Sequence, residues 1–141
     1  MKGELYLNSM VLPQTFYERD AITVAKDLIG AFLVTNFAGE KTIGRIIETE
    51  SYLGSGDPAS HSFKGKTQRN SVMFGPAGHA YVYFIYGMYY CVNVVTGKEG
   101  VGEAVLIRAL EPIEGIPLMQ KRRKAGNIHN FTDEIKTRHF F

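Results

Sequence analysis

Cysteine is nearly absent from this chain, since Cys91 is the only one among 141 residues. A disulfide framework within the chain needs at least two cysteines, and a cysteine-rich zinc site needs several, so the composition excludes both. A single thiol fits a reducing compartment. His61 has no second histidine or cysteine at ligand spacing, so no metal site is predicted.

The chain also has little excess charge of either sign and no long hydrophobic run. It carries 16 Lys and Arg against 14 Asp and Glu, a net charge of +2. Domains that bind DNA through bulk charge are usually more basic, so any basic patch must be local. The longest apolar stretch, residues 80–95, contains Gly87, Asn93 and several tyrosines. It is shorter than the ~20 residues that a membrane helix needs.

An N-terminal signal peptide is not expected either. The segment MKGELYLNSMVLPQTF lacks a compact apolar core followed by small residues. We therefore predict an intracellular protein without membrane contact. Its compartment would be the cytoplasm or nucleoid in a bacterium and the nucleus in a eukaryote.

The remaining composition favours a folded domain of the α+β class. Hydrophobic residues make up 45% of the chain, which is enough for a core. Asp20 can cap a helix that ends before Gly30. Alternation and turn residues predict further elements: strands over 31–37 and 41–52, a long loop over 53–76, two tyrosine-rich strands broken at Gly87, a strand over 103–110 and a helix over 117–124. We predict a single domain over residues 1–141, built on a curved antiparallel sheet with short flanking helices.

Glu48, Glu50 and Tyr52 alternate with other residues along the second predicted strand, so their side chains are expected on one face. The two carboxylates would lie ~6.6 Å apart along the strand. Two carboxylates at about that distance can serve an inverting glycosidase. Both can equally be solvent-exposed strand residues, and the spacing alone leaves these two interpretations open.

The strand around Tyr81 and Tyr83 can present aromatic rings on one face while the other face packs inward. Stacking of a nucleobase on such a ring is worth ~1–3 kcal/mol. Tyrosine-rich strands are also common in ordinary sheets, where the rings serve packing. The segment does not match the RNA-recognition signature, so a general RNA-binding function is not favoured.

Two polar side chains interrupt apolar strands: Asn93 in CVNVV and Arg108 in VLIRAL. Burying a polar group is costly unless it is paired, so each can be explained by a structural hydrogen bond. His61, in the long loop, can likewise be a surface residue. The presence of several such features in one small domain nevertheless favours a functional site.

Five motifs follow one another between about Pro13 and about Arg123: ETESYLG, DPASHS, TQRNSVMFGPAG, YVYFIYGMYYCVNVV and LIRALEPIEG. Each motif alone is a weak signal, whereas their joint order closely resembles one family, the alkyladenine (3-methyladenine) DNA glycosylases of the mammalian type. The resemblance implies a monofunctional base-excision repair enzyme. It would rotate a damaged purine out of duplex DNA and hydrolyse the N-glycosidic bond without a metal or organic cofactor.

By matching position, the resemblance implies catalytic roles for two residues. Glu50 would be the general base that orients and deprotonates a water molecule, and Arg108 would help to hold that water. The sugar develops oxocarbenium character during the reaction, which a nearby carboxylate stabilises.

The resemblance also implies a slot for the flipped base. Tyr52 and His61 would stack on one side of the base and Tyr83 on the other. Asn93 would lie near the purine edge and disfavour guanine, whose extra amino group would clash. A flat apolar slot suits the family's substrates, which include 3-methyladenine, hypoxanthine and ethenoadenine, and an electron-poor alkylated purine stacks well on tyrosine.

The same matching implies contacts with double-stranded DNA. Tyr86 would fill the gap left by the flipped nucleotide as a wedge. Thr67 and Met88 would contact the DNA, and the protein would act as a monomer.

The chain departs from the family near its end. Family members continue for several tens of residues beyond the position of Arg123, whereas this chain ends with KAGNIHNFTDEIKTRHFF, where we find no counterpart of the later motifs. We therefore expect a chain that lacks the family's C-terminal segment. The alternative to an active glycosylase is then a truncated, non-catalytic relative that binds damaged DNA. The basic cluster Lys121–Lys124 can contact phosphate or form a solvated helix end.

Overall fold

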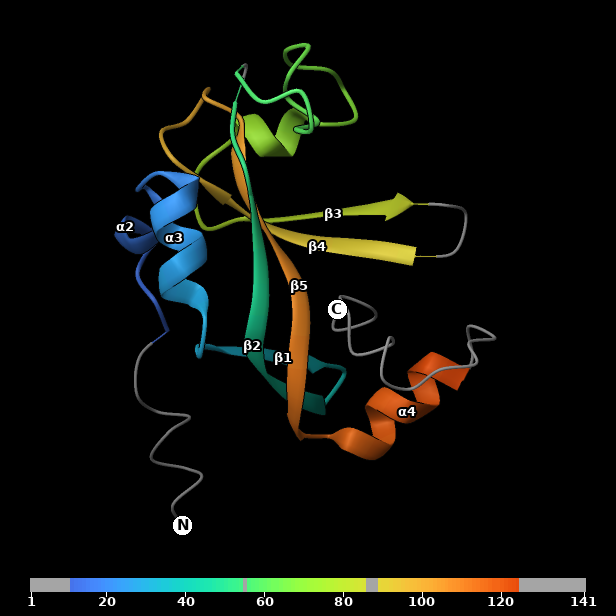
Figure 1. Ribbon diagram of the computed structural model, residues 1–141. Coiled ribbons are helices and arrows are strands. Elements are labelled where there is room, and N and C mark those ends of the chain that lie inside the picture. The colour runs from blue at the N-terminus through green and yellow to red at the C-terminus, as the bar shows by residue number, and fades with distance from the viewer. Residues whose placement is uncertain (1–10, 55, 86–88, 125–141) are drawn as a thin grey trace.

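The strands form one five-stranded antiparallel sheet, seen in Figure 1, in a computed structural model of the chain. The structure describes residues 11–54, 56–85 and 89–124. The strand order is β1-β2-β5-β4-β3, with bounds Phe32–Phe37 for β1, Glu40–Tyr52 for β2, Ala80–Ile85 for β3, Tyr89–Thr96 for β4 and Glu103–Glu114 for β5. The helices are α2 (Gln14–Tyr17), α3 (Ala21–Leu28), the 3-10 helix η1 (Ser71–Phe74) and α4 (Ile116–Lys124). The α+β prediction is confirmed.

The β1–β2 hairpin closes over the two residues Ala38 and Gly39, between the paired Phe37 and Glu40. Both loop residues have positive φ, 52° at Ala38 and 80° at Gly39. Two-residue loops with positive φ at both positions match the twist of the flanking strands, and glycine adopts that conformation without a steric penalty. The two-residue turn therefore fixes the register of the first two strands.

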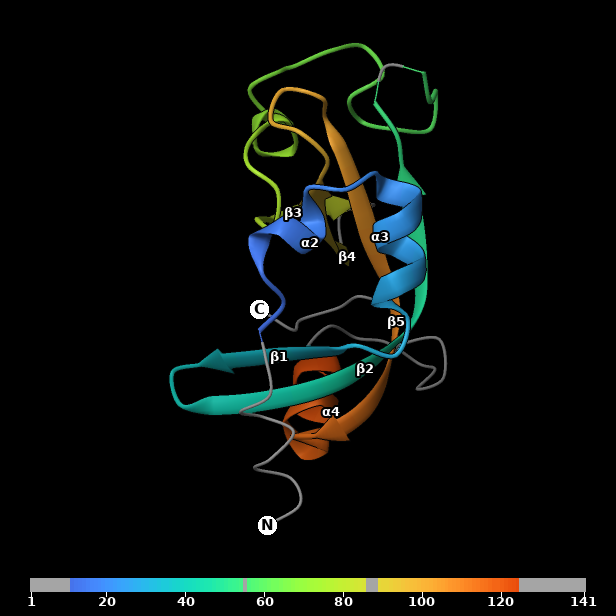
Figure 2. The same cartoon turned by 90° about the vertical axis from the view of Figure 1, so that its left-hand side faces the viewer.

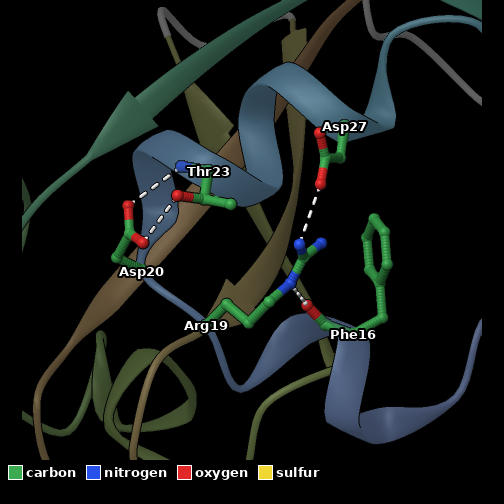
Figure 3. Close-up of polar contacts among 5 residues, drawn as sticks. All are labelled: Phe16, Arg19, Asp20, Thr23 and Asp27. Carbon is green, nitrogen blue, oxygen red and sulfur yellow. Dashed lines mark hydrogen bonds and ion pairs between the residues drawn. The ribbon is translucent and has the colours of Figure 1, made fainter.

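Helix α3 begins where the sequence predicts. The carboxylate of Asp20 accepts hydrogen bonds from the backbone N–H and the hydroxyl of Thr23, at 2.9 and 2.7 Å. These bonds lower the pKa of Asp20 and cap the helix. Figure 3 shows this cap beside a second contact, in which Arg19 donates to Asp27 and to the carbonyl of Phe16. Arg19 thereby joins α2 to α3.

The main core lies between α3 and one face of the sheet. Helix residues at the spacing expected for an apolar stripe, among them Val24 and Leu28, are buried against Ile46, Val105 and Ile107. Gly44 on β2 leaves room for Leu110, whose side chain would lie 2.9 Å from an added Cβ. A long β5 therefore packs closely across β2 and anchors the domain.

The sheet is strongly bent, as Figures 1 and 2 show. Helix α3 lies on one side of the β2–β5 pair, and the β3–β4 hairpin projects toward the other side. The loop that contains η1 lies beyond the end of β2. Among the described residues, no helix is both long and apolar enough to span a membrane.

Strand β5 continues four residues beyond its predicted end at Leu110, to Glu114. Pro112 lies in this extension and pairs with Gly44 of β2. The pairs described between β5 and β4 stop at Leu106, so Pro112 needs no ladder bond on that side. Proline usually marks the end of a strand, because it lacks an N–H for the neighbouring strand. At Pro112 the described pairing is with β2 alone, so β5 continues through the proline.

Candidate active site

One cross-strand row joins four strands on the face away from α3. Tyr81 of β3 pairs with Asn93 of β4, Asn93 pairs with Leu106 of β5, and Leu106 pairs with Glu50 of β2. Direct partners in an antiparallel ladder carry their side chains on the same face. The register therefore places these four residues on one face, here called the site face.

Glu50 is held by two partners through its two carboxylate oxygens. The hydroxyl of Tyr52 donates to Oε2 at 2.7 Å, and Nε of Arg108 lies 3.4 Å from Oε1. Burial and the neighbouring carboxylate raise the pKa of Tyr52 to about 12, so its hydroxyl keeps its proton at neutral pH. The Glu50 side chain remains 45% exposed, which leaves it open to a water molecule.

Arg108 reaches Glu50 from an irregular stretch of the β2–β5 ladder. The register shifts twice around Glu48, and neither Ile47 nor Arg108 has a described partner in this ladder. Bulges are common beside active sites because they redirect a side chain. The sequence prediction identified Arg108 as a polar interruption but contained no signal for the register shifts.

The same irregularity affects Glu48. Strict alternation predicts Glu48 and Glu50 on one face, but the ladder is not regular on either side of Glu48. Within the described contacts, the Glu48 side chain takes part in no hydrogen bond or ion pair. Glu50, by contrast, has the two partners that a positioned carboxylate needs. The two carboxylates are therefore not equivalent in their surroundings.

Aromatic rings from β3 and from the long loop lie beside the carboxylate. The ring centroids of His61 and Tyr83 are 4.3 Å apart, and those of Tyr81 and Tyr83 are 5.4 Å apart. Tyr52 packs against the same small cluster. Burial raises the pKa of Tyr83, and the thiol of Cys91 adds to that shift. The structure thus brings Tyr52, His61 and Tyr83 together around one small cluster.

The contact between His61 and Tyr83 leaves no room for a base between their rings. Favourable carbon contacts need ~3.5–4.0 Å on each side of an inserted ring, so the flanking rings would have to stand ~7–8 Å apart. A hollow of about 470 Å³ does exist nearby, lined by Leu53, Ser62, Phe74, Val101 and Glu103 among others. None of the slot residues lines it, so the slot is closed in this structure.

Asn70 anchors the loop segment that carries His61. Its buried side chain donates to the carbonyls of His61 and Gly65, at 2.9 and 3.1 Å, and accepts from the backbone of Thr67 at 2.6 Å. Sequence reasoning missed Asn70, although it stands in one of the motifs that carry the family resemblance. The sequence shows only an amide side chain in a long polar loop, and the burial of Asn70 appears only in the structure.

The imidazole of His61 lies within 3.3 Å of the Tyr81 hydroxyl, from Nδ1 to Oη. Burial lowers the pKa of His61, and the positive charge of Arg69 lowers it further. A neutral imidazole is therefore favoured at neutral pH. A neutral imidazole packs against Tyr83 without bringing a second positive charge next to Arg69.

Asn93 is buried, with 3% of its surface exposed. Its amide nitrogen donates to the carbonyl of Tyr81 at 3.1 Å, which satisfies part of its hydrogen-bonding capacity. The structural hydrogen bond considered for this residue is present, and the residue also belongs to the site face.

Of the three residues predicted to contact DNA, the structure describes only Thr67. Thr67 is exposed at the Asn70 turn. Tyr86 and Met88 lie outside the described residues. In the basic cluster, Arg122 is 3.6 Å from Glu40 and Arg123 is only 5% exposed. Arg123 is therefore a buried residue and not part of a solvated helix end.

Within the described part of the chain, no group of three or more His, Cys, Asp or Glu side chains is placed to hold a metal ion. The chemically active groups on the site face are one carboxylate, one guanidinium, a thiol, phenols and an imidazole. Such a set can position water and stack on a flat ring. Both are capacities of a hydrolase that acts beside a heterocycle.

Comparison with known proteins identifies the family. The family model for methylpurine-DNA glycosylase (MPG) matches residues 15–135. A relative from Methanoculleus marisnigri is 66% identical over 114 residues, which cover 81% of this chain and 58% of that protein. One from Legionella pneumophila is 67% identical over 105 residues, which cover 74% of this chain and 57% of that protein.

Both relatives carry the name "Putative 3-methyladenine DNA glycosylase". The chain thus spans somewhat more than half the length of the relatives that it matches. The matched part contains the whole site face and the loop that carries His61. The resemblance found in the motifs is confirmed, and the chain belongs to the methylpurine-DNA glycosylase family.

Proposed function

We propose that this protein is a base-excision DNA glycosylase that hydrolyses the N-glycosidic bond of damaged purines. The observation that carries the proposal is the paired Glu50 carboxylate, held by Tyr52 and Arg108 directly beside a cluster of aromatic rings. The names of the relatives add support, since both refer to 3-methyladenine DNA glycosylase.

In the proposed reaction, Glu50 accepts a proton from water while the water oxygen attacks C1′ of the deoxyribose. The bond from C1′ to the purine nitrogen breaks, and its electron pair leaves with the base. A 3-methyladenine nucleotide carries a positively charged base, which departs as a neutral molecule. A neutral base such as hypoxanthine departs as an anion and takes a proton from solvent water. Arg108 keeps the carboxylate in place and provides a donor for the attacking water.

The proposed substrates are flat purines of the 3-methyladenine, hypoxanthine and ethenoadenine class, everted from double-stranded DNA. Tyrosine rings offer a stacking surface worth ~1–3 kcal/mol per base, which does not depend on one hydrogen-bonding pattern. Since His61 and Tyr83 are in contact, a base can enter between them only when the rings separate. Binding is therefore expected to be coupled to movement of the His61 side chain.

The proposal is tested with a DNA duplex that contains one hypoxanthine. After incubation with the protein, hot alkali converts each abasic site into a strand break. We expect breaks with the wild-type chain and a loss of roughly hundredfold or more with Glu50→Gln, because a general base contributes about that factor. Glu48→Gln is the matched control, with the same chemical change two residues away.

Three other outcomes have distinct meanings. Tight binding of the hypoxanthine duplex without breaks would identify a damaged-DNA-binding relative. Equal losses for Glu48→Gln and Glu50→Gln would favour a reaction that uses both carboxylates, as in an inverting glycosidase. Neither binding nor breaks would contradict the proposal.

A further inference from the structure

Tyr52 has two parts with different surroundings. Its ring packs against the small buried cluster of Met73, Tyr81, Val95 and Ala104. Its hydroxyl points to the carboxylate of Glu50, two residues earlier on the same strand, and donates to Oε2 at 2.7 Å. The ring thus takes part in packing, whereas the hydroxyl is engaged with the proposed base.

We propose that the Tyr52 hydroxyl is a positioning group, which fixes the Glu50 carboxylate in the orientation needed to activate water. This inference deepens the proposed function and rests on it. It assigns to Tyr52 a role separate from the stacking role that the family resemblance implies.

The geometry supports a two-point hold. Oε2 is bound from β2 by Tyr52, and Oε1 is approached from β5 by Arg108 at 3.4 Å. Contacts to both oxygens oppose rotation about the terminal torsion of the side chain, which is otherwise broad. Each carboxylate oxygen has two lone pairs, so either can still accept a proton from water.

The identity of the donor also matters. A hydrogen bond donated to a charged group is stronger than one between two neutral groups, so it holds the carboxylate more firmly. Burial raises the pKa of Tyr52 to about 12, so the phenol does not lose its proton in the range where Glu50 would act. The bond therefore persists throughout that range.

Other charged and titratable groups near this contact come from every neighbouring strand. Arg108 on β5 is the nearest cation, and Arg69 lies near the rings of His61 and Tyr81. The remaining groups with an electrostatic effect on Tyr52 or Tyr83 are few: Cys91 on β4 and Asp57 in the loop. Glu48 precedes Glu50 on β2. Among the hydrogen bonds described, only the one from Tyr52 is donated to Glu50 by a neutral group.

The decisive variant is Tyr52→Phe, which keeps the ring and removes the hydroxyl. Tyr83→Phe is the matched control, since it removes a phenol from the same cluster that is not bound to Glu50. Single-turnover excision of hypoxanthine is measured with saturating protein from mildly acidic to mildly alkaline pH. Binding to a duplex with an uncleavable nucleotide is measured in parallel.

We expect Tyr52→Phe to slow excision roughly tenfold or more, the loss typical of a hydrogen bond to a charged group. DNA affinity should stay within about twofold, because the stacking ring remains. Tyr83→Phe should slow the single-turnover rate less than Tyr52→Phe does, since it leaves the contact with Glu50 intact. A Tyr52→Phe variant with the wild-type rate would overturn the inference, as would an equal loss of rate in Tyr83→Phe.

A measurement without DNA separates this inference from the proposed function. The side-chain carboxyl carbon of Glu50 is followed by NMR in the full chain, and its signal is assigned by its loss in Glu50→Gln. The relaxation of this carbon at neutral pH should show a more mobile carboxylate in Tyr52→Phe than in the wild type, and no such increase in Tyr83→Phe. If the mobility rises but the wild-type chain excises nothing, the contact stands and the proposed function fails. An unchanged mobility refutes the inference whatever the activity.

Discussion

The two faces of the β2–β5 pair differ in what they contain and in how they are covered. On one face, Ile46, Val105 and Ile107 are buried beneath α3. On the other, Glu50 and Arg108 retain 45% and 37% side-chain exposure beside aromatic rings. One pair of strands therefore contributes both to the hydrophobic core and to the candidate site.

The alternation of side chains along each strand separates the residues that form the core from those of the candidate site. Leu106 and Ile107 are neighbours in sequence but belong to opposite faces, as their partners Glu50 and Thr49 do. Stability should depend on one set of side chains and activity on the other. The largest predicted effect concerns the covered face.

Leu110→Ala should lower the free energy of unfolding by about 2–5 kcal/mol, because Leu110 is fully buried and its neighbour Gly44 offers no side chain to fill the cavity. Chemical denaturation provides the measurement. Ile113→Ala, on the same strand but 48% exposed, is the control and should cost at most about 1 kcal/mol. Similar losses in the two variants would break the distinction between covered and exposed positions.

Arg108→Met should do the reverse, with a small effect on stability and a large one on activity. Exposed ion pairs contribute about 0–1 kcal/mol to folding, whereas loss of a positioned donor should slow excision roughly tenfold to hundredfold. Arg45→Met is the matched control, since Arg45 also joins β2 to β5 through an ion pair, with Glu111. If both variants excise at the same rate, Arg108 has no special role.

The smallest predicted effect is a dependence of stability on pH that arises from His61, a residue of the candidate site. Its pKa is lowered in the folded chain, so the unfolded chain binds its proton more tightly and stability should fall as the pH drops below about 6.5. The effect should be small because the imidazole is largely exposed. Melting temperatures against pH should show less acid sensitivity in His61→Gln than in the wild type.

His79→Gln serves as the control for that comparison. His79 lies at the start of β3, exposed, with Nδ1 3.1 Å from the carbonyl of Pro76. His79→Gln makes the same chemical change outside the aromatic cluster. A change in acid sensitivity in His79→Gln as large as that in His61→Gln would show that the effect is not specific to His61.

Local sequence signals were sufficient for most of the fold. The Asp20 cap predicted the start of α3, and alternation together with turn residues predicted all five strands. Each of these depends on residues close together in the chain, which is why the sequence alone could predict them.

The features that sequence reasoning missed depend on residues far apart in the chain. The register shifts that free Arg108 arise from the pairing of β2 with β5, more than fifty positions away. Burial of Arg123 likewise depends on where α4 is placed by the end of β5. For the candidate site, the motifs suggested the residues, whereas the contact between His61 and Tyr83 depends on how the long loop packs.

Asn70 holds His61 by its main-chain carbonyl and makes no described bond to the imidazole. The ring can therefore turn about its own side-chain bonds while the peptide that bears it stays fixed. Side-chain rotations of exposed groups take picoseconds to nanoseconds, whereas rearrangement of a whole loop is slower. If the proposed function holds, a nucleobase would enter the site after rotation of this one side chain. Entry would then be faster than a process that required the whole loop to rearrange.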